Sequence, residues 1–291
     1  TTGTPITILI PNENVKSLDY SQMKTVARPS HADYTAECNY HGFQDSRGGG
    51  HFSGRITAAL VASGAICKFA LEKKGIYIGT HIKKCAKISD RDFGDLLSDI
   101  KTLNQKTFAV LEDERIEEMT KAIMDASSDG DSVGGVLETA VLGMPEGVGE
   151  PWFDSIESLI SHMMFSIPAV KGIEFGKGFE IADMRGSKAN DEIKLQNNKI
   201  VTVTNNNGGI NGGITNGMPV TFKCAIKPTP TIGKEQRTVD FTKNENKTFE
   251  ATGRHDPCIV HRARVVVDSV TALVLCDLLS QKFGTDWLGE K

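Results

Sequence analysis

The sequence has little of what marks several large protein classes. Aromatic residues make up 7% of the 291 residues, and the formal charge of −4 gives no basic field for nucleic acid or an anionic membrane. The six cysteines form no Cys-x-x-Cys pair, so no zinc knuckle or thioredoxin motif is present and reduced thiols are favoured. Hydrophobic residues still make up 39%, which excludes disorder as the main state. We expect a globular protein that binds neither nucleic acid nor membrane.

Long hydrophobic runs are also missing. The longest apolar stretch, from Ile56 to Cys67, ends at Lys68 and is shorter than the ~18 to 20 residues of a membrane span. The first residues, Thr1 to Pro11, have neither the basic nor the apolar region of a signal peptide. The sequence therefore predicts no membrane-spanning helix and a cytoplasmic location. A chain that starts on Thr1 in a strand-like run is expected to lack its natural beginning.

Segments with strand and helix periodicity alternate along the chain without a regular βαβ rhythm, which favours the α+β class over a doubly wound sheet. Strands are predicted at residues 5–10, 76–82, 133–143, 170–175, 199–204, 220–226 and 238–241, and helices at 52–74, 112–127, 152–167 and 258–282. A long loop is predicted over residues 12–50. Because neither a repeat nor a linker interrupts the pattern, we expect one domain over residues 1–291.

Two segments of the long predicted loop carry polar chemistry. In Arg-Pro-Ser-His-Ala-Asp at 28–33, the proline holds Arg28 extended and presents His31 nearby, although this hexapeptide alone favours a solvated turn. At 45–55, three glycines stand between Arg47 and Arg55, directly before a predicted helix whose free N–H groups suit a phosphate. We interpret this second segment as an anion site. Neither a dinucleotide fingerprint nor a P-loop is present, which leaves an NAD-linked oxidoreductase with little support.

Three later segments are also candidates. Residues 205–217 are rich in Asn and Gly, and they fit a backbone path along a ligand and a plain hairpin equally well. A Lys-Pro-Thr-Pro-Thr run occupies 227–231. In Gly-Arg-His-Asp-Pro at 253–257, Asp256 is predicted to cap the last helix, with Pro257 at its first position. This cap leaves Arg254 and His255 unexplained.

Taken in this order, the segments resemble the chorismate synthase family over nearly the whole chain. The signatures are Arg-Pro-Ser-His-Ala-Asp-Tyr at 28–34, Arg-Gly-Gly-Gly at 47–50, Gly-Thr-His-Ile at 79–82, Met-Arg-Gly-Ser at 184–187, Gly-Gly-Ile-Asn-Gly-Gly-Ile at 208–214, Lys-Pro-Thr at 227–229 and Gly-Arg-His-Asp-Pro at 253–257. Each is weak alone, but seven in register are specific.

The resemblance implies a fold, a reaction and an assembly. The fold is a β-α-β sandwich, with antiparallel sheets around a helical core. The reaction is the anti-1,4-elimination of phosphate from 5-enolpyruvylshikimate 3-phosphate, which gives chorismate in the last step of the shikimate pathway. Reduced FMN is required without net oxidation, and NADPH is the reductant if the chain reduces its own flavin. The assembly is a homotetramer.

The resemblance also assigns roles to residues. His31 serves the reduced flavin as proton donor, and Asp256 works with the flavin in accepting the substrate proton. Arg28, Arg55 and Arg254 bind the phosphate and carboxylates of the substrate. The flavin contacts are His51, Phe52, Ser53, Pro168, Ala169, Gly212, Lys227, Pro228, Thr229, Pro230, Thr231 and Arg254. No metal is expected.

The chain departs from the family pattern in two places. A family segment with the sequence Gly-Glu-Ser-His-Gly, whose histidine is expected to protonate the leaving phosphate, is not in the sequence. At position 51 a histidine stands where arginine is usual, which makes one flavin contact pH-dependent. The alternative interpretation is therefore a catalytically impaired remnant that binds FMN or assembles with partner chains. His41, His162 and His261 are assigned to structure or surface.

Overall fold

A five-stranded antiparallel sheet forms the centre of the computed structural model, which describes residues 3–11, 25–45, 47–251 and 256–289. The strand order is β2-β1-β3-β9-β4, and every neighbouring pair is antiparallel. The strands are β1 (Tyr77–Cys85), β2 (Ile88–Ser89), β3 (Gly135–Leu142), β4 (Val170–Phe175) and β9 (Val220–Ile226). This sheet, with its separate helices, confirms the predicted α+β class.

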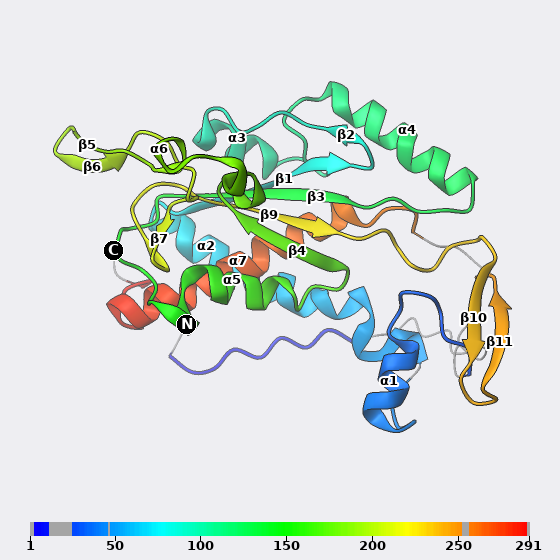
Figure 1. Cartoon of the computed structure of the whole chain (residues 1–291). Helices are drawn as coiled ribbons and strands as arrows, with labels where there is room; N and C mark the ends of the chain where they lie inside the picture. Colours follow the sequence, from blue (N-terminus) through cyan, green and yellow to red (C-terminus); the bar gives the residue numbers. More distant parts are fainter. Residues whose placement is uncertain (1–2, 12–24, 46, 252–255, 290–291) are drawn as a thin grey trace.

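The helices cover both faces of the sheet (Figure 1). They are α1 (Asp33–Tyr40), α2 (Thr57–Lys73), α3 (Leu96–Leu103), α4 (Glu114–Ser128), α5 (Ile156–Met164), α6 (Gly186–Ala189) and α7 (Val260–Phe283). Gly79 and Thr80 are neighbours on β1 and so face opposite ways. Gly79 lies against Ile100 of α3, whereas the Thr80 hydroxyl donates to Asp268 of α7 at 2.6 Å. Helices α3 and α4 therefore lie on one side of the sheet, and α7 on the other.

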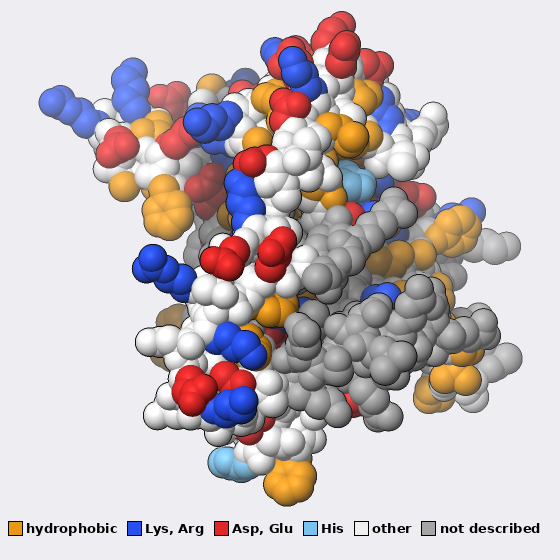
Figure 2. Space-filling model, turned by 90° about the vertical axis from the view of Figure 1, so that its right-hand side faces the viewer, with side chains coloured by type: hydrophobic (Ala, Val, Ile, Leu, Met, Phe, Trp, Pro, Cys, Tyr) orange, Lys and Arg blue, Asp and Glu red, His pale blue; other side chains and the backbone are white. Residues whose placement is uncertain are grey.

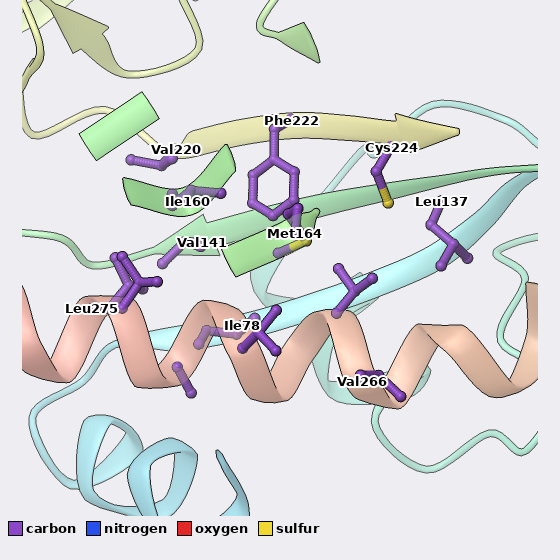
Figure 3. Close-up of a cluster of buried hydrophobic side chains, with 14 of the residues drawn as sticks. Ile78, Leu137, Val141, Ile160, Met164, Val220, Phe222, Cys224, Val266 and Leu275 are labelled. Carbon is purple, nitrogen blue, oxygen red and sulfur yellow. The ribbon is translucent and has the colours of Figure 1, made fainter. Parts of the chain in front are cut away.

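The main hydrophobic core fills the space between the sheet and the helices α5 and α7 (Figure 3). Alternate residues of β9 point into it, and Phe222 is the largest fully buried side chain. Leu137 and Val141 of β3 enter from the next strand, and Leu275 from α7. Because α7 is covered by the sheet and by neighbouring helices, fifteen of its 24 residues are buried, and its sequence shows no narrow apolar stripe.

Helix α2 packs along the far side of α7. A Cβ on Gly64 would lie 2.3 Å from the Cβ of Ser269, so glycine is what permits this close approach. Lys68 of α2 reaches Asp268 at 3.2 Å. By length and composition, the segment Gly54–Lys73 is long and apolar enough to cross a membrane. The sequence analysis had predicted no such helix, because it judged the apolar stretch from Ile56 to Cys67 too short. Gly64 and Leu71 are the buried residues of α2, so the helix packs against α7 along one side only.

In the described part of the chain, three small hairpins and four 3₁₀ turns accompany the central sheet and the α-helices. The hairpins are β5 (Ile193–Gln196) with β6 (Lys199–Thr202), β7 (Ile210–Asn211) with β8 (Ile214–Thr215), and β10 (Gln236–Asp240) with β11 (Glu245–Phe249). The 3₁₀ turns are Arg47–Phe52, Gly54–Ile56, Trp152–Asp154 and Gly178–Asp183. Residues 205–217 thus form a hairpin, one of the two interpretations that the sequence left open.

Two sequence predictions are wrong. Residues 5–10 form no strand, because no other strand in the described ranges pairs with them, and Leu9 is 86% exposed. The stretch predicted as a long loop contains α1, whose first turn carries Asp33. Part of that loop, residues 12–24, lies outside the described residues. Elsewhere the predicted helices and strands are confirmed, with ends shifted by a few residues.

Candidate functional site

The segment 28–33 folds into a tight polar turn around the guanidinium of Arg28. Arg28 donates from Nε and Nη2 to the two carboxylate oxygens of Asp33, at 2.8 and 2.7 Å, and it is 8% exposed. Burial opposes the charge on Asp33, but the hydrogen bonds from Arg28 and His31 outweigh it and hold the pKa of this carboxyl well below its usual range. The charge of the Arg28 guanidinium is therefore paired with the Asp33 carboxylate inside the turn. The sequence analysis, which assigned Arg28 to the substrate, did not predict this pair.

The same guanidinium orients His31. Arg28 Nη2 lies 2.9 Å from His31 Nδ1, and a guanidinium can only donate. The same Nδ1 lies 3.2 Å from Asp33 Oδ1, so this ring nitrogen is held between the guanidinium and the carboxylate. The His31 side chain is 19% exposed, so this turn presents a partly accessible imidazole.

Lys227 joins this turn to the end of the central sheet. Its Nζ donates to the carbonyl of Ser30 at 2.5 Å, and its backbone N–H donates to the carbonyl of Ala169 at 2.9 Å. Burial, together with the charge of Lys171, lowers the pKa of Lys227. Residues 28–31, Ala169 and Lys227 are thus brought together from three distant parts of the chain.

The loop between α4 and β3 adds two further segments. Ser132 donates to the carbonyl of Thr229 at 2.7 Å, and the next residue, Val133, donates its N–H to the carbonyl of Pro257 at 2.8 Å. Lys227–Thr231 and Asp256 therefore lie at the same end of the sheet. The hydroxyl of Thr229 is buried and has no hydrogen-bond partner within the described residues.

Asp256 does not cap the last helix. The residue at the N-cap position of α7 is Ile259, and no side chain caps it. The Asp256 carboxylate instead accepts from Arg262 Nη1 at 2.6 Å, and the two side chains are 35% and 66% exposed. The prediction fails because the helix begins later than expected: Pro257 lies two residues before the N-cap residue Ile259, and Asp256 lies three before it. Arg254 and His255 lie outside the described residues.

Further candidate residues lie together at the start of α2. His51, Phe52, Ser53 and Arg55 form two 3₁₀ turns at the amino end of α2, where the Ser53 hydroxyl accepts from the Arg55 N–H at 3.2 Å. Figure 1 places these turns on the same side of the molecule as α1 and β10–β11. Figure 2 views that side, where acidic and basic side chains are interspersed over the described surface.

Gly212 is not brought to the other candidates. It forms the β7–β8 turn, next to Gly213, whose carbonyl accepts from the N–H of Ile156 at the start of α5. Ala169 follows the opposite end of α5, a helix of nine residues and so about 13 Å long. Within a single copy of the chain, Gly212 and the Lys227 segment therefore lie near opposite ends of α5.

The sequence prediction missed the 129–135 loop. Besides Ser132, it supplies Asp129 and Asp131, which both pair with Lys234 just after the Lys227–Thr231 run. A Cβ on Gly134 would lie 2.4 Å from the carbonyl oxygen of Ile226. The available signal was Asp-Ser-Val-Gly-Gly at 131–135, a short polar turn with two glycines between a predicted helix and a predicted strand.

Comparisons with known proteins agree on one family. A family model described as chorismate synthase matches residues 1–280. The chorismate synthase of Thermococcus kodakarensis is 42% identical over 97% of this chain and 78% of its own length. That of Pyrococcus abyssi is 44% identical over 96% and 77%. A crystal structure of a chorismate synthase matches with a TM-score of 0.71 and 32% identity, over 89% of this chain and 73% of the other.

The fold is α+β, and residues 28–31, Lys227–Thr231 and Asp256 meet at one end of its antiparallel sheet. The chain belongs to the chorismate synthase family. It is therefore a lyase, and its function is the one that the resemblance implied: the elimination of phosphate that yields chorismate, with reduced FMN as the family cofactor. The alternative of an impaired remnant is not favoured.

Proposed function

We propose that the loop cluster of His31, Lys227, Thr229 and Asp256 is the active site for this elimination. The hydrogen bond from Lys227 to Ser30 carries the proposal, because it joins the histidine turn to the segment at the end of β9. The bonds of Ser132 and Val133 support it, since they place Thr229 and Pro257 beside one another.

The buried hydroxyl of Thr229 tests whether this cluster suits FMN. A buried polar atom without a partner is costly, and a bound flavin has many polar atoms that would satisfy it. The residues thus fit the cofactor, and Ala169 and Lys227–Thr231, with His51–Ser53, would hold it. Reduced FMN, when bound, supplies electrons to the elimination without net oxidation.

His31 and Asp256 have separate roles in this proposal. Arg28 and Asp33 both hold His31 at Nδ1, and we propose Nε2, the other ring nitrogen, as the one that donates the proton. Asp256 keeps a carboxylate whose ion-pair partner, Arg262, is exposed, so this carboxylate can accept the ring proton of the substrate. Proton transfer by a positioned side chain contributes typically ~10²- to 10⁴-fold.

The anionic groups of the substrate require cations. Arg55, Arg254 and the ammonium of Lys227 are proposed to bind its phosphate and carboxylates, because hydrogen bonds between charged groups are worth about 1.5 to 3 kcal/mol each. Arg28 remains a proposed substrate contact. Its bidentate bond to Asp33 supports a positioning role for the same side chain.

A homotetramer is proposed as the assembly. Apolar side chains on the outer face of α2 are exposed, with Phe69 at 63% and Ile66 at 48%. The β5–β6 hairpin extends from the body (Figure 1) and exposes Leu195 at 71%. Contiguous exposed apolar surface marks interaction sites. Gly212 would then meet the flavin of a neighbouring copy, and Leu195→Asp is expected to lower the molecular mass measured by light scattering.

The other family expectations also remain proposals. One domain over residues 1–291 is supported by the single large core that runs from Leu71 to Leu279. NADPH is proposed as the reductant if the chain reduces its own flavin, which is tested by following NADPH oxidation on addition of FMN. The proposed cytoplasmic location is tested by cell fractionation.

Anaerobic phosphate release tests the active site. Reduced FMN and 5-enolpyruvylshikimate 3-phosphate are supplied, and the wild type is compared with His31→Ala. We expect the variant to lose ~10²- to 10⁴-fold in turnover. His162→Ala is the matched control, since His162 is exposed in the last turn of α5, and it should keep wild-type turnover. Near-normal turnover of His31→Ala would show that the role assigned to this histidine is wrong.

A further inference from the structure

Two buried thiols meet at the start of α7, outside the proposed roles. Cys258 lies two residues before the first residue of α7, and Cys85 is the last residue of β1. Their sulfur atoms are 3.9 Å apart, and each residue is 1% exposed. The surroundings are specific, because the N–H of Val260 at the helix start and the imidazole of His261, the next residue, both form hydrogen bonds with the Cys258 sulfur.

These neighbours activate one thiol of the two. The hydrogen bond from Cys85 outweighs burial and, with the N–H of Val260 and the imidazole of His261, lowers the pKa of Cys258 below its usual range. The pKa of Cys85 is raised by the same pair. A helix start and a neighbouring imidazole both favour the thiolate, which is the form of cysteine that reacts with peroxide. His261 also has a buried Nδ1 without a hydrogen-bond partner among the described residues.

We propose that Cys85 and Cys258 form a redox-active pair, which peroxide closes to a disulfide that lowers activity by displacing the Asp256 turn. The formation of the disulfide is independent of the proposed function, whereas the loss of activity through Asp256 rests on it. In the first step, the Cys258 thiolate attacks one oxygen of hydrogen peroxide, so that an S–O bond forms, the O–O bond breaks and hydroxide leaves.

The second step closes the ring. The Cys85 sulfur attacks the sulfenic sulfur of Cys258, the S–S bond forms, and the S–O bond breaks as the hydroxyl leaves with the Cys85 proton as water. Overall, two thiols and one peroxide give one disulfide and two waters. The cysteines lose two electrons, and the peroxide gains them.

Closure moves the segment that carries Asp256. A disulfide requires about 2.05 Å between the sulfurs, so the pair must approach by roughly 1.9 Å from its present separation of 3.9 Å. Asp256 precedes Cys258 by two residues. Among the described residues, its carboxylate bonds only to the side chain of Arg262, which lies on α7 itself. Because a misplacement of about 1 Å can cost ~10²-fold in rate, we expect the disulfide to reduce turnover at least tenfold.

Peptide mapping tests the first part without reference to activity. The protein is treated with hydrogen peroxide, its free thiols are alkylated under denaturing conditions, and a non-reducing digest is analysed by mass spectrometry. We expect a cross-linked Cys85–Cys258 peptide that dithiothreitol removes. In Cys85→Ser, peroxide should leave a Cys258 sulfenic acid that dimedone traps. Absence of the cross-link in wild type, while the exposed Cys38 is oxidised, would overturn the proposal.

Anaerobic phosphate release tests the second part. Oxidised wild type should lose at least tenfold and recover with dithiothreitol, whereas oxidised Cys38→Ser should behave like wild type. The cross-linked peptide is measured independently of phosphate release. A failure of the proposed active site therefore changes only phosphate release, whereas a failure of the thiol pair to react removes the cross-linked peptide. A cross-linked enzyme with unchanged turnover would overturn the displacement of Asp256.

Discussion

The layered frame and the loop cluster at its end are held by different kinds of contact. Between the sheet and α7, side chains such as Phe222 and Leu137 are fully buried, and van der Waals packing holds them in place. In the cluster, Lys227 and Ser132 hold backbone carbonyls of other segments through single polar side chains. The frame thus fixes where the loops begin, and a few hydrogen bonds fix how the loops meet.

This difference predicts that stability and activity separate. Substitutions in the frame should lower the free energy of unfolding, since they remove packed volume. Substitutions in the cluster should lower turnover with little change in stability, because partly exposed polar groups add little to folding. The following variants test the separation, from the largest expected effect to the smallest.

Asp256→Ala should have the largest effect on activity. The proposed proton acceptor is lost, and we expect a decrease of ~10²- to 10⁴-fold in turnover, measured by phosphate release. The free energy of unfolding should change by less than about 1 kcal/mol, since the ion pair with Arg262 is exposed.

Arg262→Ala is the control for this variant. It removes the same ion pair but keeps the carboxylate, so turnover should fall far less than in Asp256→Ala. Equal losses in the two variants would mean that the ion pair, rather than the carboxylate, is what the reaction needs.

Phe222→Ala should have the largest effect on stability. The ring is 1% exposed and packs against Phe175 with ring centroids 5.7 Å apart. Removal of a buried aromatic ring costs about 3 to 5 kcal/mol, which urea unfolding measures. The exposed Phe179, at 84%, is the control, and Phe179→Ala should leave the unfolding midpoint nearly unchanged. A small loss in Phe222→Ala would place the core elsewhere.

Periodicity predicted the frame because its residues obey local rules. Alternation in 220–226 follows from a strand with one buried face, and the positive φ of Gly75 and Gly284 places them just beyond α2 and α7. The strand predicted at 5–10 fails for a non-local reason. Alternation shows that a segment can pair, but pairing requires a partner strand, and none lies in the described part of the chain.

The cluster was predicted through resemblance rather than through pattern. The substrate contact of Arg28 stays a prediction from the resemblance, and the structure adds a bidentate bond to Asp33, five residues away, which a loop sequence does not specify. The contribution of Ser132 was missed because a lone serine carries no period, and its bond to Thr229 spans 97 positions. Which loops meet depends on the frame, and so it is not written in any one segment.

Gly64→Ala tests the frame at a contact between two helices. The new Cβ would lie 2.5 Å from Ser269 Cα, so α2 and α7 must separate, and overpacking of this kind costs about 1 to 3 kcal/mol. Gly186 in α6 is the matched control, because nothing lies within 4 Å of its Cβ position. Gly186→Ala should be neutral or slightly stabilising. If both variants behave alike, the helix contact is looser than the structure has it.

The smallest expected effect is a pH dependence of the frame at His81, on the sheet face opposite α7. This fully buried imidazole donates to Asp90 from Nδ1 and to Glu138 from Nε2, each at 2.8 Å, while Phe93 lies edge-on and Lys83 lies 3.9 Å from Glu138. Burial opposes its charge, but the two carboxylates outweigh burial and raise the pKa of His81 above its ordinary value of 6.5.

The sign of the pH effect follows from this direction. A raised folded-state pKa means that the charged imidazole stabilises the fold fully below about pH 6.5, and that this contribution is lost as pH rises through the folded-state pKa. The free energy of unfolding, measured in urea from pH 6 to pH 9, should therefore decline with pH. In His81→Gln this decline should flatten, because the titrating group is gone. An unchanged slope in the variant would assign the decline to other groups and leave His81 uncharged in the fold.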